Sequence, residues 1–434
     1  MGLEQHDASC PGGVGPTVHQ RDTHNHRRLP RSLTSLLCRK GCGRRVTLGL
    51  TARGRLLDTC CRACAHREAG EPINHDDECT GCGIPDALGP NGLQGHCNAE
   101  EETAIGIVVG AMCGDVLGAR VKGRSEEDIQ RRYPRGMVDF RVGRNGLANY
   151  TDSTEGTLAL LCCLLDDRGF NAENATRWHC CIYSPWRGYH PSATALIEEL
   201  RAGRLSYRDS GRAQFADGSH GNRGANRVAP VGFVYRHCNE ATMRAAVEAA
   251  CQCSHVHPIA IDAAVIHAHA IAILANVRIM CEGGDQNSDI GPKELVQRLK
   301  AFAETEEMAA KLDATLQGLH LWETQGPSSS LCASVRSGIT DPVQIRATDA
   351  VASSLWAMCT HWEQPREAVV RAASFGGDST AIASMVGGLA GARHGWKWIP
   401  VGWFNALEND TLGRDHAIVY AMDLTKLATP QDVA

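Results

Sequence analysis

The stretch 103–119, TAIGIVVGAMCGDVLGA, carries a glycine at every fourth position: Gly106, Gly110, Gly114 and Gly118. Residues four apart lie on one face of an α-helix, so the spacing predicts a helix with a glycine stripe. Each interior glycine costs about 1 kcal/mol relative to alanine, which favours a second backbone packed closely against the stripe. A matching stripe lies near the end of the chain, at Gly387, Gly391 and Gly395. We expect these two helices to pack together in one core.

The rest of the chain after residue 97 shows mostly helical periodicity. Asn98, followed three residues later by Glu101, forms a capping-box pattern that starts the first glycine-striped helix. Further helices are predicted over residues 153–166, 192–205, 242–252, 258–281, 292–319, 347–361 and 366–374. Loops are predicted where Gly, Ser, Asp and Asn cluster, at 210–227, 283–291 and 324–342. Because alternating β-branched runs are few, the fold class expected for residues 98–434 is all-α.

The composition excludes several broad classes. The chain has 434 residues, 43% of them apolar and 21% charged, and a net charge of −5, which argues against wholesale disorder, a fibrous repeat or a membrane bundle. The most apolar stretches are 104–119 and 258–277, and both are interrupted by acidic residues, so no membrane span is expected. The first residues lack a basic and apolar leader. We therefore expect an intracellular protein, cytoplasmic or nuclear and not secreted, with reduced cysteines.

Two short regions precede the helical part. Residues 1–35 show no apolar periodicity, which predicts a flexible tail. Residues 36–97 predict a small zinc module, because closely spaced thiolates and imidazoles suit tetrahedral Zn²⁺. Its candidate ligands are Cys38, Cys42, Cys60, Cys61, Cys64, His75, Cys79 and Cys82. In the alternative, Cys60, Cys61 and Cys82 are simply buried and His75 caps a turn.

The same region carries a local excess of positive charge. Between Arg21 and Arg67 there are twelve Arg or Lys residues against two acidic ones. This excess suits a polyanion partner such as nucleic acid or poly(ADP-ribose), although a solvated basic face fits it equally well. The module could also recruit a protein partner.

Five patches carry the chemical signal of the helical part: 110–119 (GAMCGDVLGA), 150–154 (YTDST), 187–189 (RGY), 218–230 (GSHGNRGANRVAP) and 375–380 (FGGDST). In this order, and with 254–258 and 347–357, they resemble the ADP-ribosylglycohydrolase family from Thr103 to the end of the chain. The resemblance implies an all-α fold whose central crevice holds two Mg²⁺ ions and the ribose of an ADP-ribosyl group. It also implies cleavage of the N- or O-glycosidic bond of that ribose.

The metal loops implied by the resemblance depart from the family pattern. The predicted Mg²⁺ ligands are Thr151, Asp152, Ser153, Asp378 and Thr380. Ser153 and Thr380 stand where the family has a second Asp in each loop, and Ala381 replaces a liganding Thr. Losing two carboxylates should weaken at least one Mg²⁺ ion. Alternatively, Asp152 and Asp378 serve as helix N-caps.

The catalytic position also departs from the family, which commonly has a Glu just after its GDxxGA segment. This chain has Lys122 at the nearest position, and Glu126 and Glu127 are the candidate substitutes. The binding loops match better. The residues expected to bind the ADP-ribosyl group are Gly188, Tyr189, Ser219, His220, Gly221, Asn222 and His255, although His255 and His257 could instead cap and pack around Pro258.

Two functions of different classes fit these observations. In the first, the chain uses Mg²⁺ to bind the ADP-ribosyl groups of modified proteins, and it can also hydrolyse the ribosyl bond and so remove ADP-ribose from them. In the second, it is a catalytically inactive reader of ADP-ribose or a structural protein. The lost acidic residues resemble the family's divergent branch, which includes the J-type crystallins and a related selenoprotein.

Overall fold

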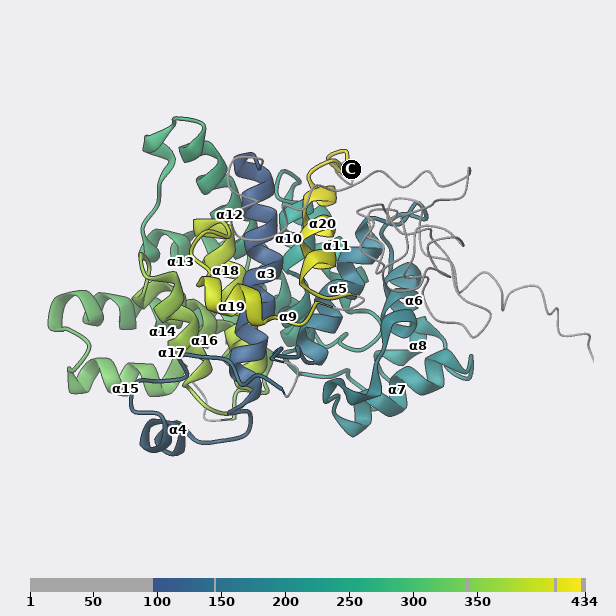
Figure 1. The fold of residues 1–434 in the computed structure, drawn as a ribbon, viewed down its shortest axis with the longest axis horizontal. Coiled ribbons are helices and arrows are strands. Elements are labelled where there is room, and N and C mark those ends of the chain that lie inside the picture. The colour runs from purple at the N-terminus through teal and green to yellow at the C-terminus, as the bar shows by residue number, and fades with distance from the viewer. Residues whose placement is uncertain (1–96, 144–145, 340–342, 410–411, 431–434) are drawn as a thin grey trace, which may run out of the picture.

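The computed structural model describes residues 97–143, 146–339, 343–409 and 412–430. These residues form a bundle of helices in which the only β pairings are three isolated bridges, so the all-α prediction is confirmed (Figure 1). The segments 1–35 and 36–96, which include all the candidate zinc ligands, lie outside the described residues. The helices are α3 (Ala99–Ala119), α4 (Glu126–Arg132), α5 (Asp152–Leu164), α6 (Ala172–Ile182), α7 (Pro191–Arg201), α8 (Tyr207–Ser210), α9 (Arg223–Arg227), α10 (Ala229–Val234), α11 (Glu240–Cys251), α12 (Pro258–Glu282), α13 (Pro292–Lys300), α14 (Glu306–Gln325), α15 (Ser330–Ile339), α16 (Ala347–Thr360), α17 (Pro365–Ala373), α18 (Ser379–His394), α19 (Val401–Ala406) and α20 (Arg414–Leu424), with short 3₁₀ turns η3 (Pro185–Arg187) and η4 (Gln286–Ser288).

Helices α3 and α18 lie against each other in the centre of the bundle (Figure 1). A methyl group on Gly110 would collide with the carbonyl oxygen of Gly387, and one on Gly387 would collide with that of Gly110. Gly114 meets the backbone of Ala383 in the same way, and Gly118 meets that of Ser379. The predicted contact between the two glycine stripes is confirmed, and it brings the two ends of the described helical region together.

The start of α3 follows its sequence signature. The Glu101 amide donates to Asn98 Oδ1 at 2.9 Å, and the Asn98 amide donates to Glu101 Oε2 at 3.1 Å. This reciprocal pair is the predicted capping box, and it satisfies two of the amides that a helix start leaves without partners.

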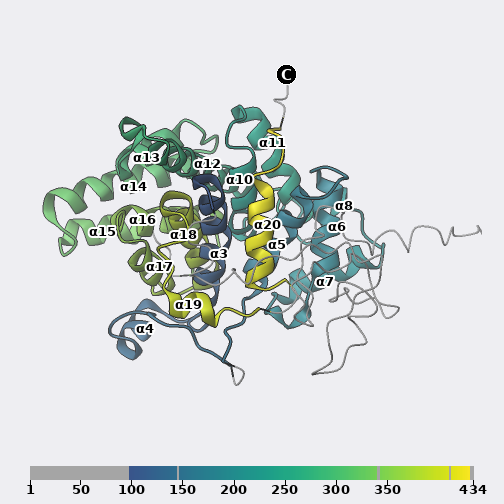
Figure 2. The ribbon, with the colours of Figure 1, turned by 45° about the horizontal axis from the view of Figure 1, so that its top comes forward.

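The remaining helices cover this central pair. Helix α20 packs against α3 and α5, as Figure 2 shows, and α12 packs against α18, α16 and α10. Both α3 and α12 have the length and apolar composition of a membrane span, but most of each lies buried inside the bundle, as expected for core helices.

Three predicted segments need correction. The helix predicted over 292–319 is two helices, α13 and α14, because the chain turns after Lys300 and Thr305 caps α14 through the Met308 amide at 3.3 Å. The predicted loop 210–227 contains α9, and the predicted loop 324–342 contains α15. Both short helices are rich in Gly, Ser or Asn, residues that favour turns when no tertiary contact is present.

Candidate functional site

Asp115 on α3 fixes the loop that starts α5. Its buried carboxylate accepts four hydrogen bonds, from the Thr151 amide at 2.8 Å and hydroxyl at 2.6 Å, and from the Thr154 amide at 3.1 Å and hydroxyl at 2.7 Å. Burial raises the pKa of Asp115, although the bonds from Thr151 and Thr154 act in the opposite direction. Both carboxylate oxygens are therefore occupied, and Asp115 acts as a positioning residue for 151–154.

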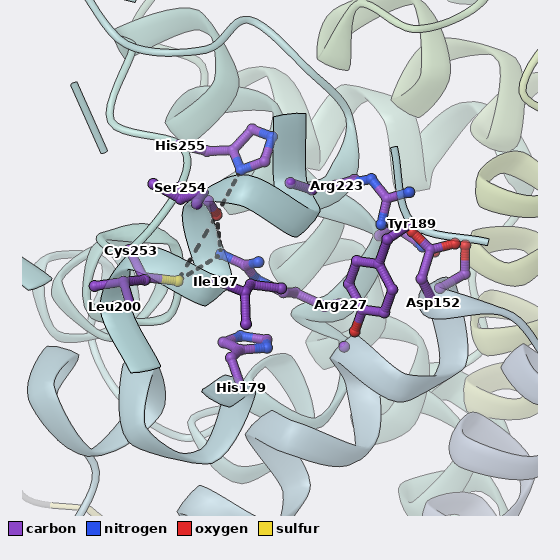
Figure 3. A pocket seen from close by; sticks show the side chains of 15 residues that line it. Asp152, His179, Tyr189, Ile197, Leu200, Arg223, Arg227, Cys253, Ser254 and His255 are labelled. Carbon is purple, nitrogen blue, oxygen red and sulfur yellow. Dashed lines mark hydrogen bonds and ion pairs between the residues drawn. The ribbon is translucent and has the colours of Figure 1, made fainter. Parts of the chain in front are cut away.

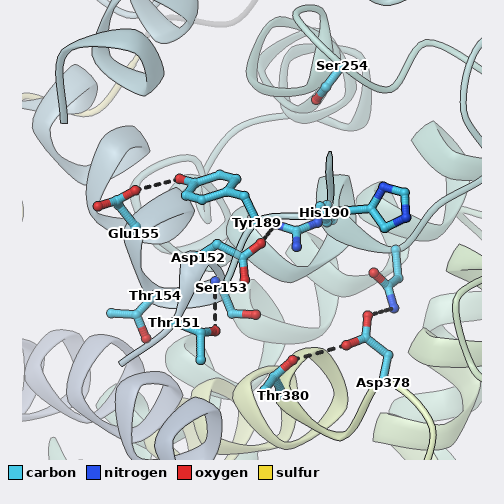
Figure 4. Close-up of polar contacts among 12 residues, drawn as sticks. Thr151, Asp152, Ser153, Thr154, Glu155, Tyr189, His190, Ser254, Asp378 and Thr380 are labelled. Carbon is cyan, nitrogen blue, oxygen red and sulfur yellow. Dashed lines mark hydrogen bonds and ion pairs between the residues drawn. The ribbon is translucent and has the colours of Figure 1, made fainter. Parts of the chain in front are cut away.

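Asp152, the first residue of α5 (Figure 4), forms an ion pair with Arg223. Its side chain is fully buried, and Oδ1 has no hydrogen-bond partner among the described residues. The helix is capped by Thr151, whose hydroxyl accepts from the Ser153 amide at 3.2 Å. Asp152 is therefore not the N-cap, and its carboxylate is available to a ligand.

Asp378 lies directly before α18 and faces a different set of donors. Asn222 Nδ2 donates to Oδ2 at 2.9 Å, and the Thr380 hydroxyl donates to Oδ1 at 3.0 Å (Figure 4). Lys122 Nζ is 3.4 Å from Oδ1. Burial alone would raise the pKa of Asp378, but Lys122, Asn222, Arg223 and Thr380 together hold that pKa below its ordinary value. We call Asp152, Asp378, Arg223 and Lys122 the charge cluster.

Segment 343–346 connects the loops that carry the charge cluster. The Asn222 amide donates to the Ile345 carbonyl at 2.9 Å, and Asn222 Nδ2 donates to the Gln344 carbonyl at 2.9 Å. The Asp378 amide donates to the Val343 carbonyl at 3.1 Å. Gln344 is buried with a φ of 56°, a left-handed conformation that non-glycine residues seldom adopt without surrounding support. This segment therefore holds the loop before α9 beside the loop before α18.

A pocket of about 70 Å³ lies beside the charge cluster, and Asp152, Tyr189, Arg223, His179 and His255 line it (Figure 3). Because pockets for drug-sized ligands measure roughly 300–1,000 Å³, this pocket accommodates only part of a nucleotide-sized ligand. The Arg223 guanidinium lies 5.6 Å from the centre of the Tyr189 ring.

The Tyr189 ring is oriented by Glu155. The Tyr189 hydroxyl donates to Glu155 Oε2 at 2.6 Å, and the Ser184 amide donates to the same oxygen at 3.0 Å. Burial raises the pKa of Glu155, with hydrogen bonds from Tyr189 and Ser184 opposing the rise. The Glu155 carboxylate, which does not itself line the pocket, thus holds the Tyr189 ring in the pocket wall.

The opposite wall is organised by Arg227. Its guanidinium donates to the Ser254 hydroxyl at 2.8 Å (Figure 3) and to the Ala250 carbonyl at 2.9 Å. His255 Nδ1 lies 2.8 Å from the same hydroxyl. Burial, followed by the charges of Arg227 and Arg223, lowers the pKa of His255 well below its ordinary value. His255 is therefore neutral and can donate or accept a hydrogen bond in the pocket.

The structure brings some predicted residues together and separates others. Asp152, Ser153, Tyr189 and His255 line the pocket. Asn222 does not line it, but donates to Asp378 of the charge cluster. The other predicted binding residues do not line it: Gly188, Ser219, His220 and Gly221. His220 instead packs against His257, with ring centres 3.7 Å apart and the ring planes tilted by 46°. His257 caps α12 by accepting from the Ile259 amide at 3.2 Å, as its alternative interpretation proposed.

The two candidate catalytic glutamates point elsewhere. The Glu126 carboxylate accepts from Arg336 at 2.9 Å and from Arg371 at 2.7 Å, and Glu127 is exposed on α4. Neither lines the pocket. Sequence reasoning missed the roles of Glu155, which directly follows a quoted patch, and of Arg223 and Asp115, which lie within two of them. The sequence contains these three residues in or beside the patches, but it does not indicate which side chains they contact.

The described part of the chain contains no cluster of side chains typical of a protein metal site. No group of three or more His, Cys, Asp or Glu side chains there could hold an ion. The predicted Mg²⁺ ligands from the two loops contribute only two carboxylates, those of Asp152 and Asp378.

Comparisons with known proteins agree with this fold. A family model described as ADP-ribosylglycohydrolase matches residues 97–433. An ADP-ribosylhydrolase ARH3 from Gallus gallus is 24% identical over 329 residues, covering 70% of this chain and 88% of the relative. An uncharacterised protein from Archaeoglobus fulgidus is 26% identical over 315 residues, covering 71% and 92%. A solved structure described as an ADP-ribosylglycohydrolase-related protein complex has a TM-score of 0.52 and 19% identity, covering 76% of this chain and 98% of its own. Since the family match spans most of the chain and the fold agrees, the chain belongs to the ADP-ribosylglycohydrolase family.

Proposed function

We propose that the chain binds the ADP-ribosyl group of modified proteins in the pocket beside the charge cluster, and that recognition is its main activity. The observation that carries this proposal is the convergence of Asp152, Tyr189, Arg223 and His255 on one pocket. A carboxylate accepts hydrogen bonds from ribose hydroxyls, a guanidinium binds phosphate oxygens, and an aromatic face packs against a sugar or base. Family membership supports the same ligand class.

Recognition is favoured over cleavage by the number of carboxyl groups within reach. Glycoside hydrolysis commonly uses two carboxyl groups, one as acid and one as base or nucleophile. Of the residues that line the pocket, Asp152 alone carries a carboxyl group, and it is paired with Arg223. Glu126 is held away by Arg336 and Arg371.

Hydrolysis of the ribosyl bond is the second candidate function, because Asp152 Oδ1 is buried without a hydrogen-bond partner among the described residues. This oxygen could accept a proton from an attacking water. Relatives named ADP-ribosylhydrolase are consistent with this chemistry. The Mg²⁺ site at Thr151, Asp152, Ser153, Asp378 and Thr380 stays a prediction.

One experiment separates the two functions. Purified chain is incubated with proteins ADP-ribosylated on arginine or serine while free ADP-ribose is measured, and binding of free ADP-ribose is followed by thermal shift. We expect a raised Tm with ADP-ribose, loss of that shift in Asp152→Asn, and no release of ADP-ribose above the protein-free blank.

The matched control is Asp313→Asn, since Asp313 is an exposed aspartate paired with Lys300. It should keep the full thermal shift. Release of ADP-ribose that depends on Asp152 would establish hydrolysis instead, and the absence of any thermal shift in the unmodified chain would contradict the proposal.

A further inference from the structure

The two carboxylates of the charge cluster each face a basic side chain of the chain itself. Asp152 is paired with Arg223, and Asp378 lies 3.4 Å from Lys122. Both acids are largely buried, with side-chain exposures of 0% and 15%. A buried carboxylate is stable only when it is neutralised by a nearby positive charge or by hydrogen bonds. Here the side chains of Arg223 and Lys122 supply that positive charge.

The backbone positions both bases. Gly123 donates its amide to the Gly377 carbonyl at 2.8 Å, and Gly377 donates to the Arg124 carbonyl at 2.9 Å. The segment that carries Lys122 is therefore bonded directly to the loop that carries Asp378. Arg223 is the first residue of α9, and the preceding Asn222 is bonded to Asp378 and to segment 343–346. The backbone hydrogen bonds thus place the segment that carries Lys122 beside the loop that carries Asp378.

Counting charges shows that this donor set does not fit a pair of divalent ions. Two carboxylates contribute two negative charges, and Arg223 and Lys122 contribute two positive charges. The nearby Asp115 has both oxygens occupied by Thr151 and Thr154. A divalent ion placed between Asp152 and Asp378 would meet a guanidinium and an ammonium group at short range, and like charges in a partly desolvated site repel strongly.

We propose that Arg223 and Lys122 take the place of the divalent ions, so that the charge cluster binds the ribose and diphosphate of an ADP-ribosyl group without metal. This inference rests on the function proposed above. A guanidinium has five N–H donors, so Arg223 can pair with Asp152 and still donate to a phosphate or hydroxyl oxygen in the pocket that it lines. Asp152 Oδ1 accepts from a ribose hydroxyl.

The test measures the affinity of the full chain for free ADP-ribose by calorimetry, once in EDTA and once in excess MgCl₂. We expect dissociation constants that agree within about twofold, since no ion takes part. Arg223→Gly should weaken binding in EDTA by about tenfold or more, because a charge-assisted hydrogen bond of roughly 1.5–3 kcal/mol is lost. Arg223→Lys should recover part of the loss.

The control variant is Arg131→Gln, which removes an exposed arginine of α4 that pairs with Asp128. This variant should bind ADP-ribose like the unmodified chain.

The outcomes distinguish this inference from the function on which it rests. Binding that requires MgCl₂ overturns the inference and leaves ADP-ribose recognition standing. No binding in either buffer overturns both. If Arg223→Gly fails to fold, as judged by circular dichroism, the comparison between EDTA and MgCl₂ on the unmodified chain still decides the question.

Discussion

The contact between α3 and α18 is buried, whereas the charge cluster joins buried acids to partly exposed bases, and the two regions depend on different properties of their residues. In the helix contact, glycines let two backbones touch, and the size of each side chain decides the packing. In the charge cluster, each acid faces a base, and the sign of each charge decides the arrangement. We therefore expect a size change to damage the first region most and a charge change to damage the second.

The largest expected effect is from adding one methyl group in the helix contact. Gly387→Ala would place a Cβ against the carbonyl oxygen of Gly110, which is backbone and cannot move without separating the helices. We expect a loss of at least about 3 kcal/mol in the free energy of unfolding, at or above the usual range for overpacking. Urea unfolding followed by circular dichroism measures it.

Gly338→Ala is the matched control for size. Gly338 lies in α15 with open space around the position of its Cβ, so the same change there should leave the stability unaltered or raise it by up to about 1 kcal/mol. Equal losses in the two variants would show that close backbone approach is not what the stripe provides.

A charge change at Asp115 should have the next largest effect. Asp115→Asn keeps the shape but turns an amide donor toward the four donors of Thr151 and Thr154. We expect a loss of roughly 2–3 kcal/mol together with weaker ADP-ribose binding, measured by urea unfolding and calorimetry. Asp313→Asn, on the surface, should change neither, and an unaltered Asp115→Asn would contradict the role assigned to this carboxylate.

His267 in α12 places a titratable group in the buried core of the bundle. Neither ring nitrogen has a hydrogen-bond partner among the described residues, and burial lowers the pKa of His267 to about 4. Because the unfolded chain binds this proton near pH 6.5 and the folded chain only near pH 4, stability present above pH 6.5 should fall as the pH decreases. Between pH 6.5 and 5 the loss is on the order of 2 kcal/mol.

His267→Leu should remove that part of the acid sensitivity, which unfolding curves at a series of pH values would reveal. The comparison is with the unmodified chain at each pH, so that any packing change cancels. If the two pH profiles run parallel, His267 is not responsible for the loss.

The smallest expected effect is at the wall of the pocket. Tyr189→Phe removes the hydroxyl that donates to Glu155 at 2.6 Å and keeps the ring. Since the Ser184 amide still donates to that carboxylate, the cost should be about 1 kcal/mol, with ADP-ribose affinity reduced severalfold. Tyr207→Phe serves as the control, because the Tyr207 hydroxyl makes no hydrogen bond within the described segments. A larger loss of binding in that variant would argue against this pocket.

The sequence predicted the parts of the molecule that depend on local spacing. The glycine stripes predicted the contact between α3 and α18, and Asn98 with Glu101 predicted the cap. The pairing of Asp152 with Arg223 could not be predicted, because it joins the first residues of α5 and α9, which several helices separate along the chain. Segment 343–346 lies between the predicted loop 324–342 and the predicted helix 347–361, and its position between Asn222 and Asp378 depends on tertiary contacts. The zinc and polyanion predictions concern residues that the structure does not describe.

Helix α3 carries both the glycine stripe and Asp115, and this has a consequence for its register. Each glycine of the stripe meets one particular backbone segment of α18, so α3 cannot slide along its partner by a single residue without placing a side chain where only hydrogen fits. A slip of one full turn would shift Asp115 by about 5.4 Å, beyond the reach of Thr151 and Thr154. The glycines thus determine, from the middle of the bundle, where the first turn of α5 begins.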